Sequence, residues 1–108
     1  MYRNPFVKFI IKILCMQQNG KNLIKEKLLI QAISTTIKKL RKEKLKSQRM
    51  LADEYEIQKS LLSRMESASN SPMFISVWKV AEALGVKPSD FVMLIEKELP
   101  ENFLLTDE

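Results

Sequence analysis

The 108-residue sequence lacks histidine entirely and contains a single cysteine, Cys15. A lone thiol cannot form a disulfide within the chain, and the usual zinc sites need several cysteine or histidine ligands. No serine, cysteine or clustered acid stands beside a base in the pattern that catalysis requires. These absences exclude a disulfide-stabilised scaffold and a zinc finger, and we predict no enzyme activity, no metal and no cofactor.

Glycine and proline are also scarce, with two glycines and four prolines in the chain. Both residue types interrupt helices, so their scarcity favours long helices with few turns. Hydrophobic residues make up 45% of the sequence and charged residues 29%, a balance typical of globular rather than disordered chains. A chain of this length is expected to form one domain with a modest core.

Positive charge is concentrated in one stretch. The net charge is +5, and residues 38–49 carry seven lysines and arginines against one acid, Glu43. The balance reverses from residue 90 onward, where six acids oppose one lysine. A basic segment of this density is expected of a protein that binds a polyanion. A solvated helix face is the alternative, so the segment indicates nucleic acid only in a suitable structural context.

The most apolar segment, FVKFIIKILCM at residues 6–16, is too short to span a bilayer and is interrupted by Lys8 and Lys12. The two lysines lie four residues apart and share one helical face, so we predict an amphipathic helix. It could pack on the domain, on a second subunit or on a membrane surface without stable insertion. A further alternative is that Met16 is the natural start and residues 1–15 are dispensable.

Helical periodicity predicts the structure of the remainder. Apolar spacing predicts helices over residues 22–34 and 36–44, either separate or continuous. Trp78 is expected to pack in or beside the core, and NFLL at residues 102–105 is the one candidate for a strand. Capping residues, glycine and proline delimit four shorter helices, predicted over residues 48–54, 58–67, 74–84 and 88–99.

The stretch SQRMLADEYEIQKSLLSRMES at residues 47–67 begins as a helix, breaks near residues 54–57 and then resumes. Helices this short are not stable alone, so the pair must pack together across a tight turn. Ala52 is expected where the two backbones approach most closely. The apolar side chains predicted to meet between the helices are Leu51, Tyr55, Ile57, Leu62 and Met65.

Polar side chains remain on the outer face of the second helix. Hydroxyls and long cations of this kind suit base edges and phosphates. The amides behind Ser47, together with Gln48, suit a phosphate at the start of the first helix. This arrangement predicts a helix-turn-helix. The outward residues are Lys59, Ser60, Ser63, Arg64 and Ser67.

The order and spacing of these segments resemble the phage-repressor (Cro/repressor, XRE-type) helix-turn-helix family over residues 37–91. The blocks LRKEK, SQRMLADEY, LLSRMES and WKVAEALGV carry the resemblance. It implies an all-α fold, a five-helix repressor-like DNA-binding domain over residues 35–99. We expect an N-terminal helical extension over residues 1–34 and an acidic C-terminal tail over residues 100–108.

The resemblance also implies roles for single residues. Gln48, beside Ser47, corresponds to the glutamine that anchors the DNA backbone. Arg41 and Glu66 match a structural ion pair between the first helix and the recognition helix, which suits a planar guanidinium facing a carboxylate. The recognition-helix positions that face bases or nearby phosphates are Lys59, Ser60, Ser63 and Arg64.

Two lysines outside the motif are expected to position the protein on the DNA backbone. We predict that Lys38 and Lys39 contact phosphates, which orient a protein on DNA without carrying sequence information. The sequence departs from the family at three positions that usually carry glycine, namely Leu45, Glu56 and Ala68. Glu56 would need a positive φ, at a cost of about 1 kcal/mol, and the first helix could be rewound at Leu45.

The function implied is a sequence-specific transcriptional regulator, a repressor, that binds double-stranded DNA at a palindromic operator as a homodimer. It would act in the cytoplasm on the nucleoid. The last helix or the N-terminal helix would supply the dimer interface. The alternative is an antitoxin that binds its own operator and a partner toxin protein, the latter through residues 1–34.

Overall fold

The computed structural model of the protein describes residues 21–106, with side chains described from residue 23 onward. The helix predicted over residues 6–16 and the alternative start at Met16 lie outside this part. The described residues form five α-helices joined by short turns. They are α2 (Lys21–Glu43), α3 (Gln48–Tyr55), α4 (Lys59–Glu66), α5 (Phe74–Ala83) and α6 (Pro88–Lys97).

The prediction of an all-α fold is confirmed, because no strand occurs between residues 21 and 106. Residues 102–105, the one candidate for a strand, form a turn followed by irregular chain. None of the five helices is long and apolar enough to cross a membrane.

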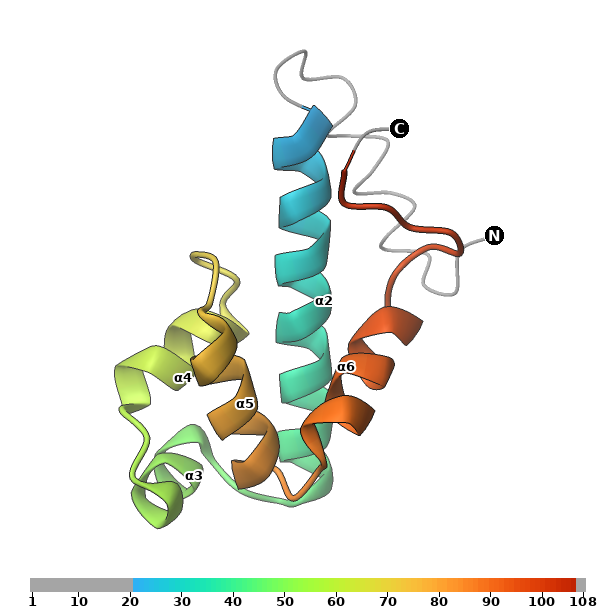
Figure 1. Ribbon diagram of the computed structural model, residues 1–108. Helices are drawn as coiled ribbons and strands as arrows, with labels where there is room; N and C mark the ends of the chain where they lie inside the picture. Colours follow the sequence, from blue (N-terminus) through green and yellow to red (C-terminus); the bar gives the residue numbers. More distant parts are fainter. Residues whose placement is uncertain (1–20, 107–108) are drawn as a thin grey trace.

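Helix α2 lies at the centre, with α3 and α4 on one side and α6 on the other (Figure 1). Helix α5 lies between α4 and α6 in the same view. The packing agrees with this picture: α2 contacts α4 and α6, while α5 contacts α3 and α6. Each short helix is therefore stabilised by tertiary packing, since helices of eight to ten residues are marginal alone.

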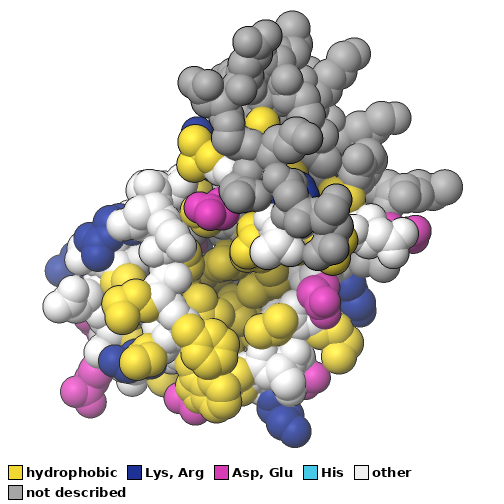
Figure 2. Space-filling view, turned by 45° about the horizontal axis from the view of Figure 1, so that its top comes forward, with side chains coloured by type: hydrophobic (Ala, Val, Ile, Leu, Met, Phe, Trp, Pro, Cys, Tyr) yellow, Lys and Arg dark blue, Asp and Glu magenta, His cyan; other side chains and the backbone are white. Residues whose placement is uncertain are grey.

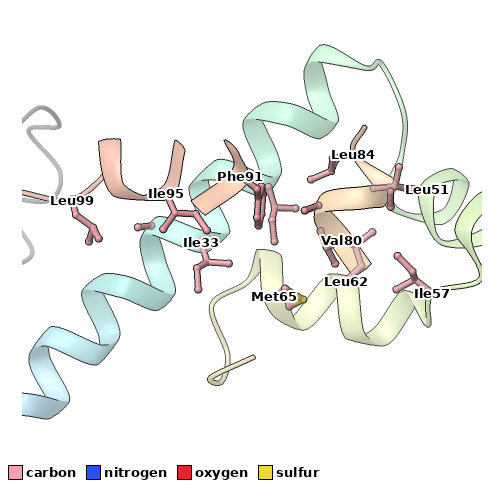
Figure 3. Close-up of a cluster of buried hydrophobic side chains, with 14 of the residues drawn as sticks. Ile33, Leu51, Ile57, Leu62, Met65, Val80, Leu84, Phe91, Ile95 and Leu99 are labelled. Atoms are coloured by element: carbon pink, nitrogen blue, oxygen red, sulfur yellow. The ribbon is translucent and has the colours of Figure 1, made fainter. Parts of the chain in front are cut away.

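A hydrophobic cluster joins all five helices (Figure 3). Phe91 of α6 is completely buried, as are Ile37 of α2 and Leu62 of α4. Burying an apolar side chain of this size contributes about 1.5–3 kcal/mol relative to leaving it in water. Leu51 of α3 and Val80 of α5 complete the centre of the cluster, so the two helices of the motif share one core with the rest of the domain.

Helix α2 is continuous over 23 residues and does not break at the polar residues Ser34, Thr35 and Thr36. The Ser34 hydroxyl donates to the Glu66 carbonyl of α4, and the Thr36 hydroxyl donates to the Ala32 carbonyl at 2.8 Å. These hydroxyls are buried with partners, so they cost the helix little. Of the two arrangements left open by the sequence, the single continuous helix is therefore the one observed.

The expected division of the chain between residues 34 and 35 falls inside α2. Leu28, Ala32 and Ile33, on the N-terminal side of that division, are buried members of the same core cluster. The last part of the expected extension is therefore integral to the helix-turn-helix domain. The physical reason is that α6 packs along α2. Ile95 and Leu99, which follow Phe91 in the chain, are buried as well, so α2 must extend far enough to cover them.

The turn between α5 and α6 uses one of the two glycines. Gly85 has a φ of 74°, and its N–H donates to the Glu82 carbonyl at 3.0 Å. A Cβ at this position would lie 3.0 Å from the Lys44 Nζ. Pro88 then opens α6, with Asp90 in its first turn. The predicted stop at Gly85 and start at Pro88 are confirmed.

Candidate nucleic-acid interface

The motif begins with a capped helix. Ser47 has extended backbone angles, and its side-chain oxygen accepts a hydrogen bond from the Met50 N–H at 3.1 Å. This satisfies one of the amides that the start of a helix leaves without a partner. The predicted cap is confirmed, and the half-buried Gln48 begins α3 immediately after it.

The turn of the motif has left-handed geometry without glycine. Glu56 has φ 53° and ψ 42°, which confirms the positive φ predicted for this position. The Ile57 N–H donates to the Ala52 carbonyl at 3.0 Å and closes the turn. Leu45 and Ala68, the other two positions where the family carries glycine, each have φ 57°.

The end of the first helix is not rewound at Leu45. Helix α2 ends at Glu43, and the Leu45 N–H donates to the Lys42 carbonyl at 3.0 Å. The backbone thus keeps the left-handed helix end that glycine would adopt more easily.

The apolar side chains predicted to meet between α3 and α4 are buried there, with one exception. Leu51, Leu62 and Met65 are buried, together with Ala52 at the close approach and Ile57 from the turn. Leu51, Ile57, Leu62 and Met65 are labelled beside the rest of the core in Figure 3. The core thereby sets the angle between the two helices.

The prediction that Tyr55 packs between α3 and α4 is wrong, because its side chain is 46% exposed. Tyr55 is the last residue of α3, and the chain reverses at Glu56 immediately after it. After the reversal, Ile57 is buried in the core, as predicted. The phenol is therefore left at the surface of the motif.

Arg41 and Glu66 form the ion pair expected from the resemblance. The Arg41 Nε lies 2.7 Å from the Glu66 Oε2, and Nη2 lies 2.9 Å from Oε1, so the contact is bidentate. The third donor, Nη1, bonds to the Lys46 carbonyl at 2.9 Å. The hydrogen bonds to Glu66 raise the pKa of Arg41, against the opposing effect of burial.

This pair fixes the orientation of α4, the predicted recognition helix, relative to α2. Glu66 is only 3% exposed, and the Ser34 hydroxyl bonds to its backbone carbonyl. Helix α2, the segment leading into α3 and helix α4 are thus tied at one point. Recognition helices must present their side chains at a defined angle, and paired charges with complete hydrogen bonding provide that rigidity.

The outer face of α4 carries the four predicted reading residues. Lys59, Ser60 and Arg64 are exposed, and Ser63 is half-buried. At 100° per residue, the four lie within about 140° of the helix circumference. Among residues 21–106, Lys59 and Arg64 form no ion pair, so both cations are available to an anion. The structure therefore brings this set together on one surface.

Ser67 lies at the end of this face but is engaged locally. It is the C-cap of α4, and its hydroxyl donates to the Arg64 carbonyl at 3.1 Å and bonds to the Ser69 hydroxyl. Its contribution is to end the helix.

The structure separates the two lysines that were predicted to contact phosphates. The Lys39 Nζ lies 2.5 Å from the Glu98 Oε2, beyond the end of α6. Lys39 lies two positions before Arg41, which faces α4, so at 100° per residue their side chains leave α2 in nearly opposite directions. The structure does not bring Lys39 to the α3–α4 surface. Lys38 is exposed on the flank of α2.

An ion pair that sequence reasoning missed lies beside the motif. The Lys46 Nζ is 2.5 Å from the Glu54 Oε1, and this hydrogen bond raises the pKa of Lys46. Lys46 precedes α3 and Glu54 lies near the end of that helix, so neither the i,i+3 nor the i,i+4 spacing of helical ion pairs indicates this contact. In the described part, the basic cluster consequently retains four cations without a salt bridge, which are Lys38, Lys42, Lys44 and Arg49.

The described residues contain no group of three or more acidic, cysteine or histidine side chains placed to hold a metal ion. The surface chemistry of the motif is instead that of cations and hydroxyls on a rigid helix.

A capped helix, a left-handed turn and a second helix with an exposed polar face together define a helix-turn-helix domain. A family model described as helix-turn-helix matches residues 37–91, about half of the chain. The protein belongs to this family, the phage-repressor (XRE-type) helix-turn-helix proteins.

Two characterised relatives show the range of proteins that share this similarity. The chain is 34% identical over 64 residues to the HTH-type transcriptional regulator SutR of Escherichia coli, a match covering 59% of this chain and 36% of that protein. It is 36% identical over 66 residues to the type II methyltransferase M.Sau96I of Staphylococcus aureus. That match covers 61% of this chain but 15% of the methyltransferase. No solved structure matches the chain at a comparable level of similarity.

Proposed function

We propose that the protein is a transcriptional regulator that binds double-stranded DNA by placing α4 in the major groove. The observation that carries this proposal is the outer face of α4, where Lys59 and Arg64 are exposed without ion pairs among the described residues. The ion pair between the partly buried Arg41 and the buried Glu66 holds that face in place. Long cations on such a helix pair best with the two acceptors of guanine.

Contacts to the DNA backbone come from a separate set of residues. Gln48 and the first amides of α3 are suited to one phosphate, and the exposed Lys38 is suited to another. These contacts supply affinity and register, and they weaken with salt because bound cations are released from the DNA. Glu56, exposed in the turn, opposes them with a negative charge.

One such domain reads only a few base pairs, so we propose a homodimer on a palindromic operator. Two recognition helices related by a two-fold axis would then read half-sites about 34–36 Å apart. Occupation of such a site can exclude RNA polymerase from an overlapping promoter, so repression needs no further surface. We place this activity in the cytoplasm, on the nucleoid.

Of the two relatives, one supports the proposal of a regulator and the other gives no basis for an enzyme. The Escherichia coli protein is named as an HTH-type transcriptional regulator, and this chain spans about a third of its length. The match with the methyltransferase spans 15% of that protein and gives no basis for methyl transfer. We therefore propose DNA binding without enzymatic activity.

The packing of α2 reduces the surface on which an antitoxin could bind its toxin. Leu28, Ala32 and Ile33 are buried in the core and cannot serve a partner protein. A toxin would have to bind residues 1–20 or the exposed side of α2, so the alternative now rests on a smaller segment than residues 1–34. Stoichiometric capture of a toxin by the whole protein, and its loss when residues 1–20 are removed, would support it.

The experiment that tests the main proposal is selection of bound duplexes from a random DNA library at fixed salt. We expect enrichment of a motif with two-fold symmetry and half-sites spaced by one helical turn. Failure to enrich any sequence, with the protein folded by circular dichroism, would contradict sequence-specific binding. Enrichment of an asymmetric motif would retain DNA binding but contradict the homodimer.

A further inference from the structure

Helix α5 and the start of α6 form a groove, which we call the α5–α6 groove. Its volume is about 330 Å³, at the lower end of the range of about 300–1,000 Å³ found for pockets that hold small molecules. Figure 2 shows hydrophobic side chains gathered on one face of the domain, beside a hollow. The apolar residues that line the groove are Phe74, Val77, Trp78, Pro88 and Val92.

The aromatic wall of the groove is held in place. The rings of Phe74 and Trp78 meet edge to face, with their centroids 6.0 Å apart. The Trp78 Nε1 donates to the Glu82 Oε2 at 3.2 Å, so the indole is fixed by a second contact. Both aromatic side chains are nevertheless exposed. A flat aromatic ligand would continue the edge-to-face arrangement and would cover apolar surface that now faces water.

The polar groups of the groove come from the start of α6. They are Lys87 and Ser89, so the described lining contains one cation and no acid. Lys87 forms no salt bridge with any residue between 21 and 106. The acids closest to it in the chain, Glu82 and Asp90, do not line the groove, and Glu82 is engaged by the indole. The charge that the groove can accept is therefore negative.

The backbone at this end of α6 adds to the preference for an anion. The first amides of a helix lack partners within it and carry a partial positive charge. Lys87 is the N-cap residue, and its side chain is a donor that cannot accept a hydrogen bond from them. Ser89, whose amide belongs to this group, lines the groove. Asp90, in the same turn, opposes an anion, so we expect the Lys87 ammonium to supply most of the selectivity.

We propose that the α5–α6 groove is a binding site for a small aromatic carboxylate. The ring lies against Phe74 and Trp78, and the carboxylate meets the Lys87 Nζ and the Ser89 hydroxyl. A single ring on a short chain suits the volume of the groove, whereas a polyanion would need a longer run of cations. The site shares no side chain with the outer face of α4, so this inference stands apart from the proposed DNA binding.

The first test is a titration of the full chain, labelled with nitrogen-15, by 3-phenylpropionate. Trp78 is the only tryptophan, so the single indole N–H resonance reports on the groove. We expect a saturable shift of this resonance with a dissociation constant of about 1 mM or below. The matched neutral probe, 3-phenylpropan-1-ol, should bind about fivefold more weakly, because an exposed ion pair contributes up to about this factor.

The second test removes the cation. Lys87→Gln should weaken the binding of 3-phenylpropionate about fivefold and leave the binding of the alcohol unchanged. The control is Lys79→Gln, because Lys79 is exposed on α5 and does not line the groove. It should bind both probes as the wild type does. Equal affinities of the wild type for the acid and the alcohol, or an unchanged affinity of Lys87→Gln for the acid, would overturn the proposal.

The third test places a charge in the apolar wall. Val92→Glu should weaken the binding of both probes by about tenfold or more, because the new carboxylate would be desolvated against the ligand ring. The control is Met93→Glu, since Met93 is the next residue of α6, is exposed to a similar degree and does not line the groove. Circular dichroism should show native helix content for both variants. Wild-type affinity in Val92→Glu would place the ligand elsewhere.

Two further outcomes would also overturn the proposal. One is an indole resonance that does not move with 3-phenylpropionate up to about 10 mM, ten times the expected dissociation constant. The other is a resonance that moves with protein concentration and ignores the probe, which would mean that a second copy of the chain fills the groove. All these titrations are made without DNA, so the ligand site and the regulatory function can fail independently.

Discussion

Four residues other than glycine adopt a left-handed backbone within residues 21–106, and three of them stand where the family usually carries glycine. Leu45, Glu56 and Ala68 have φ angles of 53° to 57°. A residue with a Cβ in this conformation costs about 1 kcal/mol or more relative to glycine. The turn geometry of the motif is therefore held by packing against the conformational preference of these residues.

Glu56→Gly should stabilise the protein by about 0.5–1 kcal/mol, because relief of the strain exceeds the added freedom of the unfolded chain. Urea unfolding followed by circular dichroism measures the change. The control, Glu56→Gln, keeps the strain and removes the charge, so its stability should change little. Both variants should bind DNA more tightly if Glu56 faces the phosphates. A lower midpoint for Glu56→Gly would contradict strain at this turn.

Arg41→Ala should destabilise the fold by about 3 kcal/mol, because it leaves the nearly buried Glu66 without its partner. Glu66→Ala should cost a similar amount or somewhat less, since Arg41 reaches some solvent. The pKa of Arg41 is raised, so its stabilising effect is complete below the pKa of an unfolded arginine and is lost only above the folded value. The contribution is therefore constant across neutral pH.

The control for this pair is Lys39→Ala, which removes an exposed salt bridge worth at most about 1 kcal/mol. Thermal or urea unfolding of the three variants at one pH gives the comparison. Equal, small effects in all three would show that the Arg41–Glu66 pair does not fix the recognition helix.

At the scale of elements, α4 should read the bases. Arg64→Ala or Lys59→Ala should relax the preference at one or two positions of each half-site by about 1–3 kcal/mol. Site selection with each variant at fixed salt measures this directly. Both residues are exposed, so stability should change little. Selected motifs identical to those of the wild type would mean that α4 is not the reading helix.

Helix α2 should position the protein without reading sequence. Lys38→Ala is expected to weaken binding to all sequences alike and to lower the salt slope by about one unit. Lys39→Ala is the matched control, because this lysine pairs with Glu98 on the opposite side of α2. Its slope should equal that of the wild type. Equal losses for both lysines would place DNA on a surface other than α3–α4.

At the scale of the whole molecule, the folding unit begins earlier than the motif does. A truncated chain starting at Met16 should fold, because it retains all the core residues of α2. A chain starting at residue 35 loses Leu28, Ala32 and Ile33 from the core. With about 1.5–3 kcal/mol for each large apolar side chain, this loss is comparable with the stability of a small domain. We expect the shorter chain to be unfolded.

Circular dichroism and thermal melting of the two truncated chains test this expectation. Cooperative melting of the chain from residue 35 would restore the boundary expected from the sequence. Failure of the chain from Met16 to fold would make residues 1–15 part of the structural unit.

The sequence by itself determined the features that depend on neighbouring residues. Ser47 caps α3, Gly85 ends α5 and Pro88 opens α6, because each acts through dihedral angles and hydrogen bonds within one turn. The left-handed turn at Glu56 was expected from the family resemblance, because the family usually carries glycine at this position. The Arg41–Glu66 pair was recognised only through the family resemblance, since the two residues are 25 positions apart.

Only the tertiary structure decided which residues from distant segments meet. Helix α2 is continuous past Ser34, whose buried hydroxyl bonds to the Glu66 carbonyl of α4. Lys39 pairs with Glu98, away from the candidate site. Trp78, expected in or beside the core, is 46% exposed. Helical periodicity states that a face is apolar but not which helix covers it. That choice is made by the packing of α2, α5 and α6, which no local pattern encodes.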